Sequence, residues 1–207
     1  MVALAYEDLG GISSVADNPK VPASIRSRDR NDKQRFAFQC DPARPFTGII
    51  HVQAAVGNPS KSTTDTIWFD IAEMIIDEEG GSWSYEAIGE FSSVRVVCKA
   101  GNYWSAAHGS SAATVAANGN FTINGINIAV TAGDDAATVA GIINANAGII
   151  LDGTIKADVI SPTSLRIYKT DGADLLLVDT TNTPLADLGI SAGTFRGGVI
   201  TKIQMLR

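Results

Sequence analysis

The sequence predicts a mainly β protein, an antiparallel β-sandwich with a small α+β domain inserted into it. Three observations lead to this prediction. Short runs of alternating apolar and polar residues, separated by turn-forming clusters, fill residues 35–105, which is typical of antiparallel strands. An Asn-Gly pair lies between two further alternating runs and is followed by apolar residues at helical spacing. A last alternating run ends the sequence.

These patterns divide the chain into three parts. Residues 1–34 are punctuated by Gly and Pro and predict an extended N-terminal arm. Residues 35–105 together with residues 196–207 form the predicted sandwich, and residues 106–195 form the predicted inserted domain. The predicted inserted domain holds three basic residues against eight aspartates, a net charge of −5, whereas the whole chain carries −6. This asymmetry supports two distinct folding units.

Five strands are predicted in the first β region, and clusters rich in Gly, Pro and charged residues separate them. A bulge is expected near Ser92–Ser93, because Phe91 is out of phase with the apolar residues that follow. The cluster EEGG at residues 78–81 is predicted to be a hairpin tip. The five runs are RFAFQC, GIIHVQAAV, DTIWFDIAEMII, GSWSYEAIG and EFSSVRVVCKA.

The second region begins with the small, polar stretch AAHGSSAATVAANG, which marks the boundary. Asn124-Gly125 predicts a type I′ hairpin turn, since both central residues of that turn need positive φ. A helix is predicted to start near residues 131–134 and to stop at Gly148. Three strands and a short helical turn beginning at Pro184 follow.

The terminal run GGVITKIQMLR predicts a strand that returns to the sandwich beside VRVVCKA. In this prediction Val199, Thr201 and Ile203 share one face. The second region would then be an insertion between two strands of the sandwich, which is tolerated where the ends of an insertion lie close together.

The composition is that of a folded, soluble chain. Of 207 residues, 45% are hydrophobic and 18% are charged, and a core of this size needs no disulfide or metal. Cys40 and Cys98 lie in apolar runs and are expected to be buried thiols. The first residues show no signal peptide and no run reaches the length of a membrane span, so we expect synthesis in a bacterial cytoplasm and no membrane partner.

A basic cluster lies at the end of the arm. With Lys33 and two aspartates, its four arginines leave a local charge of +3. One interpretation is a solvated loop, and the other is an arm that docks on an acidic neighbouring subunit through arginine–carboxylate pairs. Nucleic acid is disfavoured as a partner, because no aromatic residues are interleaved for base stacking. The four candidate docking residues are Arg26, Arg28, Arg30 and Arg35.

No catalytic, cofactor or metal site is predicted. His51 and His108 are the only histidines, and no zinc-type ligand spacing, phosphate loop or nucleophile motif occurs. Ser110 and Ser111 follow His108, yet closeness in sequence is not a catalytic geometry. The acids at residues 77–79 lack calcium-loop spacing. Asp171, Asp174 and Asp179 are interpreted in the same way, as solvated loop residues. The sequence therefore predicts a protein that is not an enzyme.

Four aromatic residues leave two interpretations open. They either form a platform that stacks on a host glycan or pack in the core. These residues are Trp83, Tyr85, Tyr103 and Trp104.

The second region resembles the small repeat domain of flagellar hook-associated and filament-cap proteins, the hook IN motif. That domain has a strand, an Ile-Asn-Gly turn, a second strand, a helix ending in Ile-Asn, and a closing Leu-Gly-hydrophobic phrase. The likeness covers about 80 residues, in FTINGINIAVTAGDDAATVAGIINANAG, IKADVI, SLRIY and LGISAGTF. The matching positions are Ile123, Asn124, Gly125, Ile143, Asn144, Leu188 and Gly189.

The same motif occurs in virion proteins of tailed phages. The first region, with PFTGIIHVQAAV and WSYEAIGEFSSVRV, is similar to small β-sandwich virion proteins of contractile-tailed phages. The chain lacks the long terminal helices that hook-associated proteins use for filament assembly. These resemblances imply a structural component of a bacteriophage virion, in the tail, baseplate, neck or capsid decoration. It would assemble with other virion proteins and with copies of itself. The alternatives are a carbohydrate-binding adhesin and a flagellar accessory protein.

Overall fold

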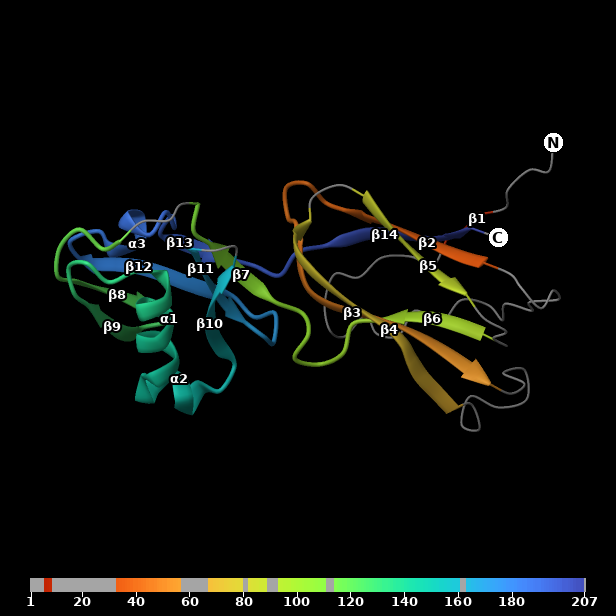
Figure 1. Cartoon of the computed structure of the whole chain (residues 1–207), viewed down its shortest axis with the longest axis horizontal. Helices are drawn as coiled ribbons and strands as arrows, with labels where there is room; N and C mark the ends of the chain where they lie inside the picture. Colours follow the sequence, from red (N-terminus) through yellow and green to blue (C-terminus); the bar gives the residue numbers. More distant parts are fainter. Residues whose placement is uncertain are drawn as a thin grey trace. The chain divides into compact units, whose positions relative to one another are not determined.

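The computed structural model describes residues 6–8, 33–56, 67–79, 82–88, 93–110, 114–160 and 163–206 (Figure 1). Among these residues the chain is mainly β, as predicted, with several antiparallel sheets. The chain divides into two compact units. Unit 2 is Trp104–Gly197, and unit 1 consists of the chain on either side of it, Met1–Tyr103 with Gly198–Arg207.

The described strands of unit 1 form two antiparallel sheets, with the strand orders β1-β14-β2-β5 and β4-β3-β6. Their bounds are β1 Tyr6–Asp8, β2 Lys33–Cys40, β3 Phe46–Val56, β4 Ile67–Glu79, β5 Ser82–Ile88, β6 Ser93–Val97 and β14 Ile200–Leu206.

Consecutive strands of unit 1 often belong to different sheets. β3 and β4 pair with each other along their lengths, but β4 and β5 lie in separate sheets. The predicted hairpin tip at EEGG is therefore wrong, because that segment connects two sheets. The turn cluster alone did not indicate which strands would pair, since pairing depends on residues far away in the sequence.

The terminal strand β14 lies between β1 and β2, and the predicted position beside VRVVCKA is wrong. The predicted face is also wrong. The register against β2 shifts between Ile200 and Lys202, so Thr201 is an extra residue that bulges out. Ile200 and Ile203 are consequently both fully buried although an odd spacing separates them, while Thr201 is exposed.

One apolar cluster of unit 1 takes side chains from both sheets. Its largest fully buried members are three phenylalanines, and the two cysteines lie among them as buried thiols, as expected. Burial raises the pKa of the Cys98 thiol to about 12, so this thiol stays protonated at neutral pH. The cluster comprises Phe36, Phe38, Cys40, Phe46, Ile50, Val52, Ile76, Val96, Cys98, Tyr103, Ile200 and Ile203.

Unit 2 also has two antiparallel sheets, with the orders β10-β11-β7 and β13-β12-β8-β9, and three short helices. In Figure 1, α1 and α2 lie beside β10. The bounds are β7 Ser105–His108, β8 Gly119–Ile123, β9 Ile126–Val130, α1 Ala136–Ala145, α2 Ala147–Asp152, β10 Ile155–Ile160, β11 Ser164–Lys169, β12 Leu175–Thr181, α3 Pro184–Asp187 and β13 Gly193–Phe195.

The predicted hairpin between β8 and β9 is confirmed, with φ of 48° at Asn124 and 82° at Gly125. Other details of unit 2 differ from the prediction. Asp135 caps α1 by accepting from the Thr138 amide, and the helix ends before Asn146 rather than at Gly148. Asn146 also caps α2, accepting from the Gly148 amide, so the chain turns and starts a second helix there.

The segment predicted to be a polar boundary contains a strand, β7, which pairs with β11. Its alternation is hard to recognise in the sequence because Ser105, Ala106 and Ala107 are all small, yet Ser105 and Ala107 are fully buried.

Candidate functional site

The predicted docking arginines are only partly described. Arg26, Arg28 and Arg30 lie outside the described residues. Arg35 lies in β2, and its guanidinium is 3.3 Å from the Glu86 carboxylate on the neighbouring strand β5. Arg35 is thus engaged within its own sheet.

Two of the four predicted aromatic residues lie in one strand, and the other two are adjacent in the chain. Trp83 and Tyr85 lie in β5, opposite Phe38 and Phe36 of β2. Tyr103 is 4% exposed, packs against Phe46, and donates a 2.6 Å hydrogen bond to the Gly198 carbonyl.

Trp104 is 8% exposed and lies in unit 2, with its ring centroid 4.7 Å from that of Tyr168. The Arg166 guanidinium lies over both of these rings, at 5.3 and 5.0 Å, and pairs through two nitrogens with Asp158. Neither Tyr103 nor Trp104 offers an open ring face to a sugar.

The residues weighed as nucleophile and acids make local structural contacts. The Ser110 hydroxyl donates to the Gly189 carbonyl, and Ser111 lies outside the described residues. His108 lies in β7, opposite Arg166. The residues 77–79 end β4.

The three aspartates interpreted as solvated loop residues also have partners. Asp171 pairs with Lys169 at 2.8 Å, Asp174 pairs with Arg196 at 3.4 Å, and Asp179 accepts from the Leu185 amide.

A polar network crosses the sheet β4-β3-β6. His51 and Gln53 of β3 alternate with apolar residues in the sequence, and both are buried, with His51 4% exposed. Gln53 donates to Asp70 at 2.7 Å and accepts from Arg95 at 2.7 Å. Lys99 pairs with the other Asp70 oxygen at 2.5 Å. The network therefore links all three strands of this sheet.

His51 is held at one end of its ring. The Asn102 side-chain nitrogen lies 2.7 Å from Nε2, and an amide nitrogen only donates, so Nε2 accepts and the neutral ring carries its proton on Nδ1. Nδ1 lies 3.3 Å from Asp70 Oδ2 and 4.0 Å from Glu73 Oε2, without hydrogen-bond geometry.

Asp70 has donors on both of its oxygens. The Lys99 hydrogen bond, followed by that of Gln53, lowers the pKa of Asp70 below its ordinary value. These charge-assisted hydrogen bonds hold the strands of the sheet together.

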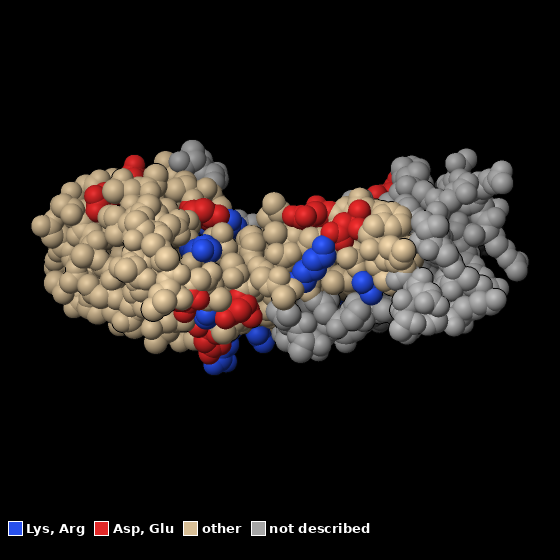
Figure 2. All heavy atoms as spheres, turned by 90° about the horizontal axis from the view of Figure 1, so that it is seen from below, with Lys and Arg blue, Asp and Glu red and all other residues tan. Residues whose placement is uncertain are grey.

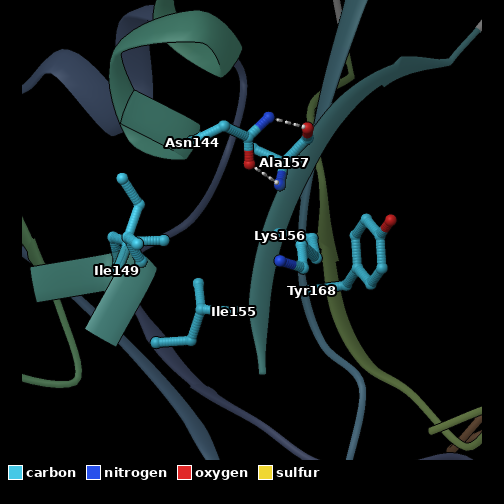
Figure 3. A pocket seen from close by; sticks show the side chains of 7 residues that line it. Asn144, Ile149, Ile155, Lys156, Ala157 and Tyr168 are labelled. Carbon is cyan, nitrogen blue, oxygen red and sulfur yellow. Dashed lines mark hydrogen bonds between the residues drawn. The ribbon is translucent and has the colours of Figure 1, made fainter. Parts of the chain in front are cut away.

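Side-chain amides bond to backbone groups on one edge strand of each sheet in unit 2. Strands β10 and β9 are edges. Asn144 of α1 accepts from the Ala157 amide at 3.0 Å and donates to the Ala157 carbonyl at 2.7 Å, as a neighbouring strand would (Figure 3). Asn146 donates to the Asn127 carbonyl on β9. These contacts occupy backbone groups that would otherwise pair with another chain.

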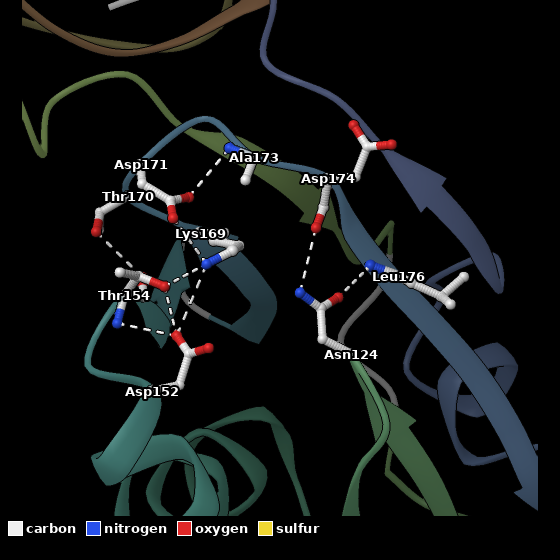
Figure 4. Close-up of polar contacts among 9 residues, drawn as sticks. All are labelled: Asn124, Asp152, Thr154, Lys169, Thr170, Asp171, Ala173, Asp174 and Leu176. Carbon is white, nitrogen blue, oxygen red and sulfur yellow. Dashed lines mark hydrogen bonds and ion pairs between the residues drawn. The ribbon is translucent and has the colours of Figure 1, made fainter.

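Asn124 makes the same kind of contact inside a sheet. Its side chain accepts from the Leu176 amide at 2.6 Å and donates to the Asp174 carbonyl at 3.2 Å (Figure 4). The hairpin tip is thereby fixed to β12.

A buried lysine ties two loops of unit 2 together. Lys169 is 8% exposed, and its ammonium contacts Asp171 at 2.8 Å, Asp152 at 3.8 Å and the Thr154 hydroxyl (Figure 4). The Thr154 hydroxyl also donates to Asp152. This bond, with a smaller contribution from Lys169, lowers the pKa of Asp152. The buried charge is therefore compensated on two sides.

A groove with a volume of about 340 Å³ lies beside β10. Figure 3 shows Ile149 and Ile155 on one side of the β10 ribbon and Lys156 with Tyr168 on the other. Sequence reasoning missed this groove, because its lining comes from α1, α2, β10 and β11 and no motif marks it.

Among the described residues, no three His, Cys, Asp or Glu side chains gather in an arrangement for a metal ion. No helix in that part of the chain combines the length and apolarity needed to cross a bilayer. Comparisons of the chain with protein-family models, curated proteins and solved structures give no match.

Proposed function

We propose that the chain is a structural component of a bacteriophage virion, in the tail, baseplate, neck or capsid decoration, and acts through protein–protein assembly and not as an enzyme. In this proposal unit 1 is an antiparallel β-sandwich, and unit 2 is a hook IN-like α+β domain inserted between two of its strands. The partners are other virion proteins and copies of the same chain.

The observation that carries the proposal is the place of the seven residues through which unit 2 resembles the hook IN motif. Three are core side chains at 0–1% exposure: Ile123, Ile143 and Leu188. Asn124-Gly125 is the type I′ turn and Asn144 closes the β10 edge. Gly189 has φ of 72°, a conformation that favours glycine. The likeness therefore lies in residues that determine shape, which supports a common fold.

Exposed apolar side chains in unit 1 support an assembly role. Ile67 and Ile75 lie on the edge strand β4 and are 77% and 69% exposed. Exposed aliphatic residues on a sheet edge are a liability for an isolated protein and a contact surface for one that assembles.

Quantitative mass spectrometry of gradient-purified phage particles tests the function. The expected result is a fixed number of copies of the chain per particle, retained through a second gradient. A chain that stays in the soluble fraction of the lysate, while the particles are complete without it, overturns the proposal.

The arm provides a sharper test of the docking mechanism. Replacing Arg26, Arg28 and Arg30 with glutamate is expected to reduce incorporation into particles without lowering the melting temperature, because arginine–carboxylate contacts with a neighbour are reversed. Lys202→Glu is the control for a general charge effect. Normal incorporation of the triple variant would remove the docking arm from the proposal.

The adhesin alternative required open aromatic faces. Tyr103 and Trp104 are buried, so no observation favours a glycan partner at these two residues. A glycan array with the whole chain is expected to show no binding.

A further inference from the structure

We propose that the groove beside β10 binds the C-terminal residue of a partner protein, taking its aliphatic side chain against α2 and its free carboxylate at Lys156. This proposal adds a binding site to the proposed assembly function. It rests on that function only in taking the ligand to be part of a protein.

Lys156 differs from the other basic side chains of unit 2 in its ion pairing. Unit 2 has four basic side chains, and three of them form ion pairs: Arg166 with Asp158, Lys169 with Asp171, and Arg196 with Asp174. Lys156 is exposed and has no ion-pair partner among the described residues. In a unit with eight aspartates, the ammonium of Lys156 is the place where an incoming carboxylate meets uncompensated positive charge.

Figure 2 shows how the charges are distributed over one face of the molecule. In the part of the view that belongs to unit 2, on the left, uncharged atoms cover most of the surface, and acidic side chains gather close to the few basic ones. Acidic side chains therefore accompany most of the basic ones, which leaves few positions where a carboxylate meets unpaired positive charge.

The second step concerns apolar surface. Ile150 and Leu151 of α2 are 63% and 89% exposed, and Ile150 lines the groove together with Ile149 and Ile155. Covering such side chains with an aliphatic group is favourable in proportion to the area removed from water. The groove is small for a ligand site, so it suits one residue rather than a long segment.

The third step concerns the backbone. A continuing peptide strand would need the amide and carbonyl of Ala157, and Asn144 holds both. Strand addition is therefore blocked at the centre of the groove, and recognition must use side chains. A chain end suits this geometry, because a single terminal residue carries both an aliphatic side chain and a carboxylate.

The experiment uses the full chain and the peptide acetyl-Gly-Ser-Gly-Ala-Leu with a free C-terminus. Binding is followed by NMR of isoleucine methyl groups. Ile150 is the reporter, and Ile75, which is 69% exposed and lies in unit 1, is the matched control. We expect the Ile150 methyl to shift in the millimolar range of peptide, the affinity range of a short ligand, and the Ile75 methyl to stay unchanged.

Changes to the peptide and to Lys156 locate the two contacts. The amidated peptide, and the Lys156→Gln variant with the acid peptide, should each bind about threefold more weakly, the size of an exposed ion pair. The two changes together should weaken binding no further, because they remove the same contact. A peptide ending in serine should lose about tenfold. Lys202→Gln should bind like the parent chain.

Equal binding of the acid and amide peptides, no shift at Ile150, or an equal shift at Ile75 would each overturn the proposal. Tighter binding of an internal Leu-Asp peptide with an amidated end would overturn the assignment to a chain terminus. The particle experiment separates this proposal from the assembly function. A chain that is present in particles but binds no peptide loses the groove alone, whereas a chain that binds the peptide but is absent from particles keeps the groove and loses the virion role.

Discussion

Units 1 and 2 differ in the stretch of chain that each needs to complete its sheets. Every described strand of unit 2 lies within Trp104–Gly197. In unit 1, by contrast, β14 pairs with β2, and Thr201 donates to the Gln39 carbonyl across 162 positions of sequence. Closing such a long loop costs entropy before any contact is gained. Unit 1 therefore cannot complete its sheet until β14 has been made, whereas unit 2 can complete both of its sheets before that.

The two units also differ in the side-chain contacts that hold their strands in place. Unit 2 uses asparagine amides as substitutes for backbone, at Asn124 and Asn144. Unit 1 uses a charged network over β3, centred on Asp70. An amide bridging buried or edge backbone groups is insensitive to pH, while an ion pair is not. The asparagine contacts of unit 2 should therefore resist a change of pH that weakens the Asp70 network, although unit 2 also holds ion pairs at Lys169 and Arg166.

The largest expected effect comes from deleting residues 200–207. The deletion removes two fully buried isoleucines and leaves the edge of β2 open, so unit 1 should lose its cooperative melting while unit 2 keeps its own. Hydrogen-exchange mass spectrometry, which reports on each unit separately, measures this. Protection in β2 and β5 that equals the parent's would show that β14 is dispensable and that the contrast between the units is wrong.

A smaller loss of the same unit is expected from Gly198→Ala. A Cβ there would lie 1.9 Å from the Pro45 carbonyl oxygen and 2.4 Å from the Phe46 Cα, and neither backbone atom can move aside cheaply. We expect a loss of about 3 kcal/mol from overpacking, measured by urea unfolding.

Gly141→Ala is the matched control, since it lies in α1 with open space around it and should stabilise unit 2 by about 0.5 kcal/mol. An unchanged urea midpoint for Gly198→Ala would show that the backbone at Gly198 can move away from Pro45 and Phe46 at little cost.

Pairing between strands that are adjacent in the chain could be predicted from the sequence, and pairing between distant strands could not. The β8–β9 hairpin follows from Asn124-Gly125, because the turn and both strands are adjacent in the chain. The mainly β character and the terminal strand were also predicted correctly. The neighbour of that strand was not, because alternation shows that a run is a strand but not which edge it joins.

The alternation of apolar and polar residues also did not predict which side chains are buried. His51 alternates with apolar residues in the sequence, yet it is buried, with Asp70 and Glu73 of β4 and the Asn102 side chain beside its ring. The Thr201 bulge places Ile200 on the same buried face as Ile203, and no feature of the Val-Ile-Thr-Lys-Ile run predicts it. The groove beside β10 combines residues from four elements, so only the packed structure could bring them together.

Gly125→Val should break the local part of unit 2 and spare unit 1. Its φ of 82° strains a β-branched residue, and no atom lies within 4 Å of the position that a Cβ would take, so the loss comes from backbone strain alone, about 2 kcal/mol. Gly125→Asn, which tolerates positive φ, should lose much less. Equal melting of both variants would show that strain at this turn does not limit the stability of unit 2.

Asn144→Ala tests whether an amide guards the β10 edge. Losing both bonds to Ala157 should destabilise unit 2 by about 1.5 kcal/mol, and the opened edge should let the chain self-associate as its concentration rises. Light scattering after size exclusion measures the association. Asn127→Ala, on the edge strand β9, is the control and should associate no more than the parent. An Asn144→Ala variant that melts at a lower temperature but associates no more than the parent would show that Asn144 contributes to stability alone.

The smallest expected effect concerns acid and the network of unit 1. The folded-state pKa of Asp70 is lowered, first by the Lys99 hydrogen bond and then by that of Gln53. A lowered carboxyl pKa contributes stability that is present above the ordinary value of 3.8 and is lost as the pH falls through the folded-state pKa. The Asp70 and Lys99 side chains are 37% and 41% exposed, so solvent screening limits the contribution to about 0.5 kcal/mol. Asp70→Asn should therefore lower the stability of unit 1 by this amount at pH 7, and the difference from the parent should vanish in strong acid, while unit 2 is unaffected at either pH. Urea unfolding at the two pH values measures it. A difference that persists in acid would mean that Asp70 acts through its shape and its bond to Gln53, and that the charged network is no more pH-sensitive than the amides of unit 2.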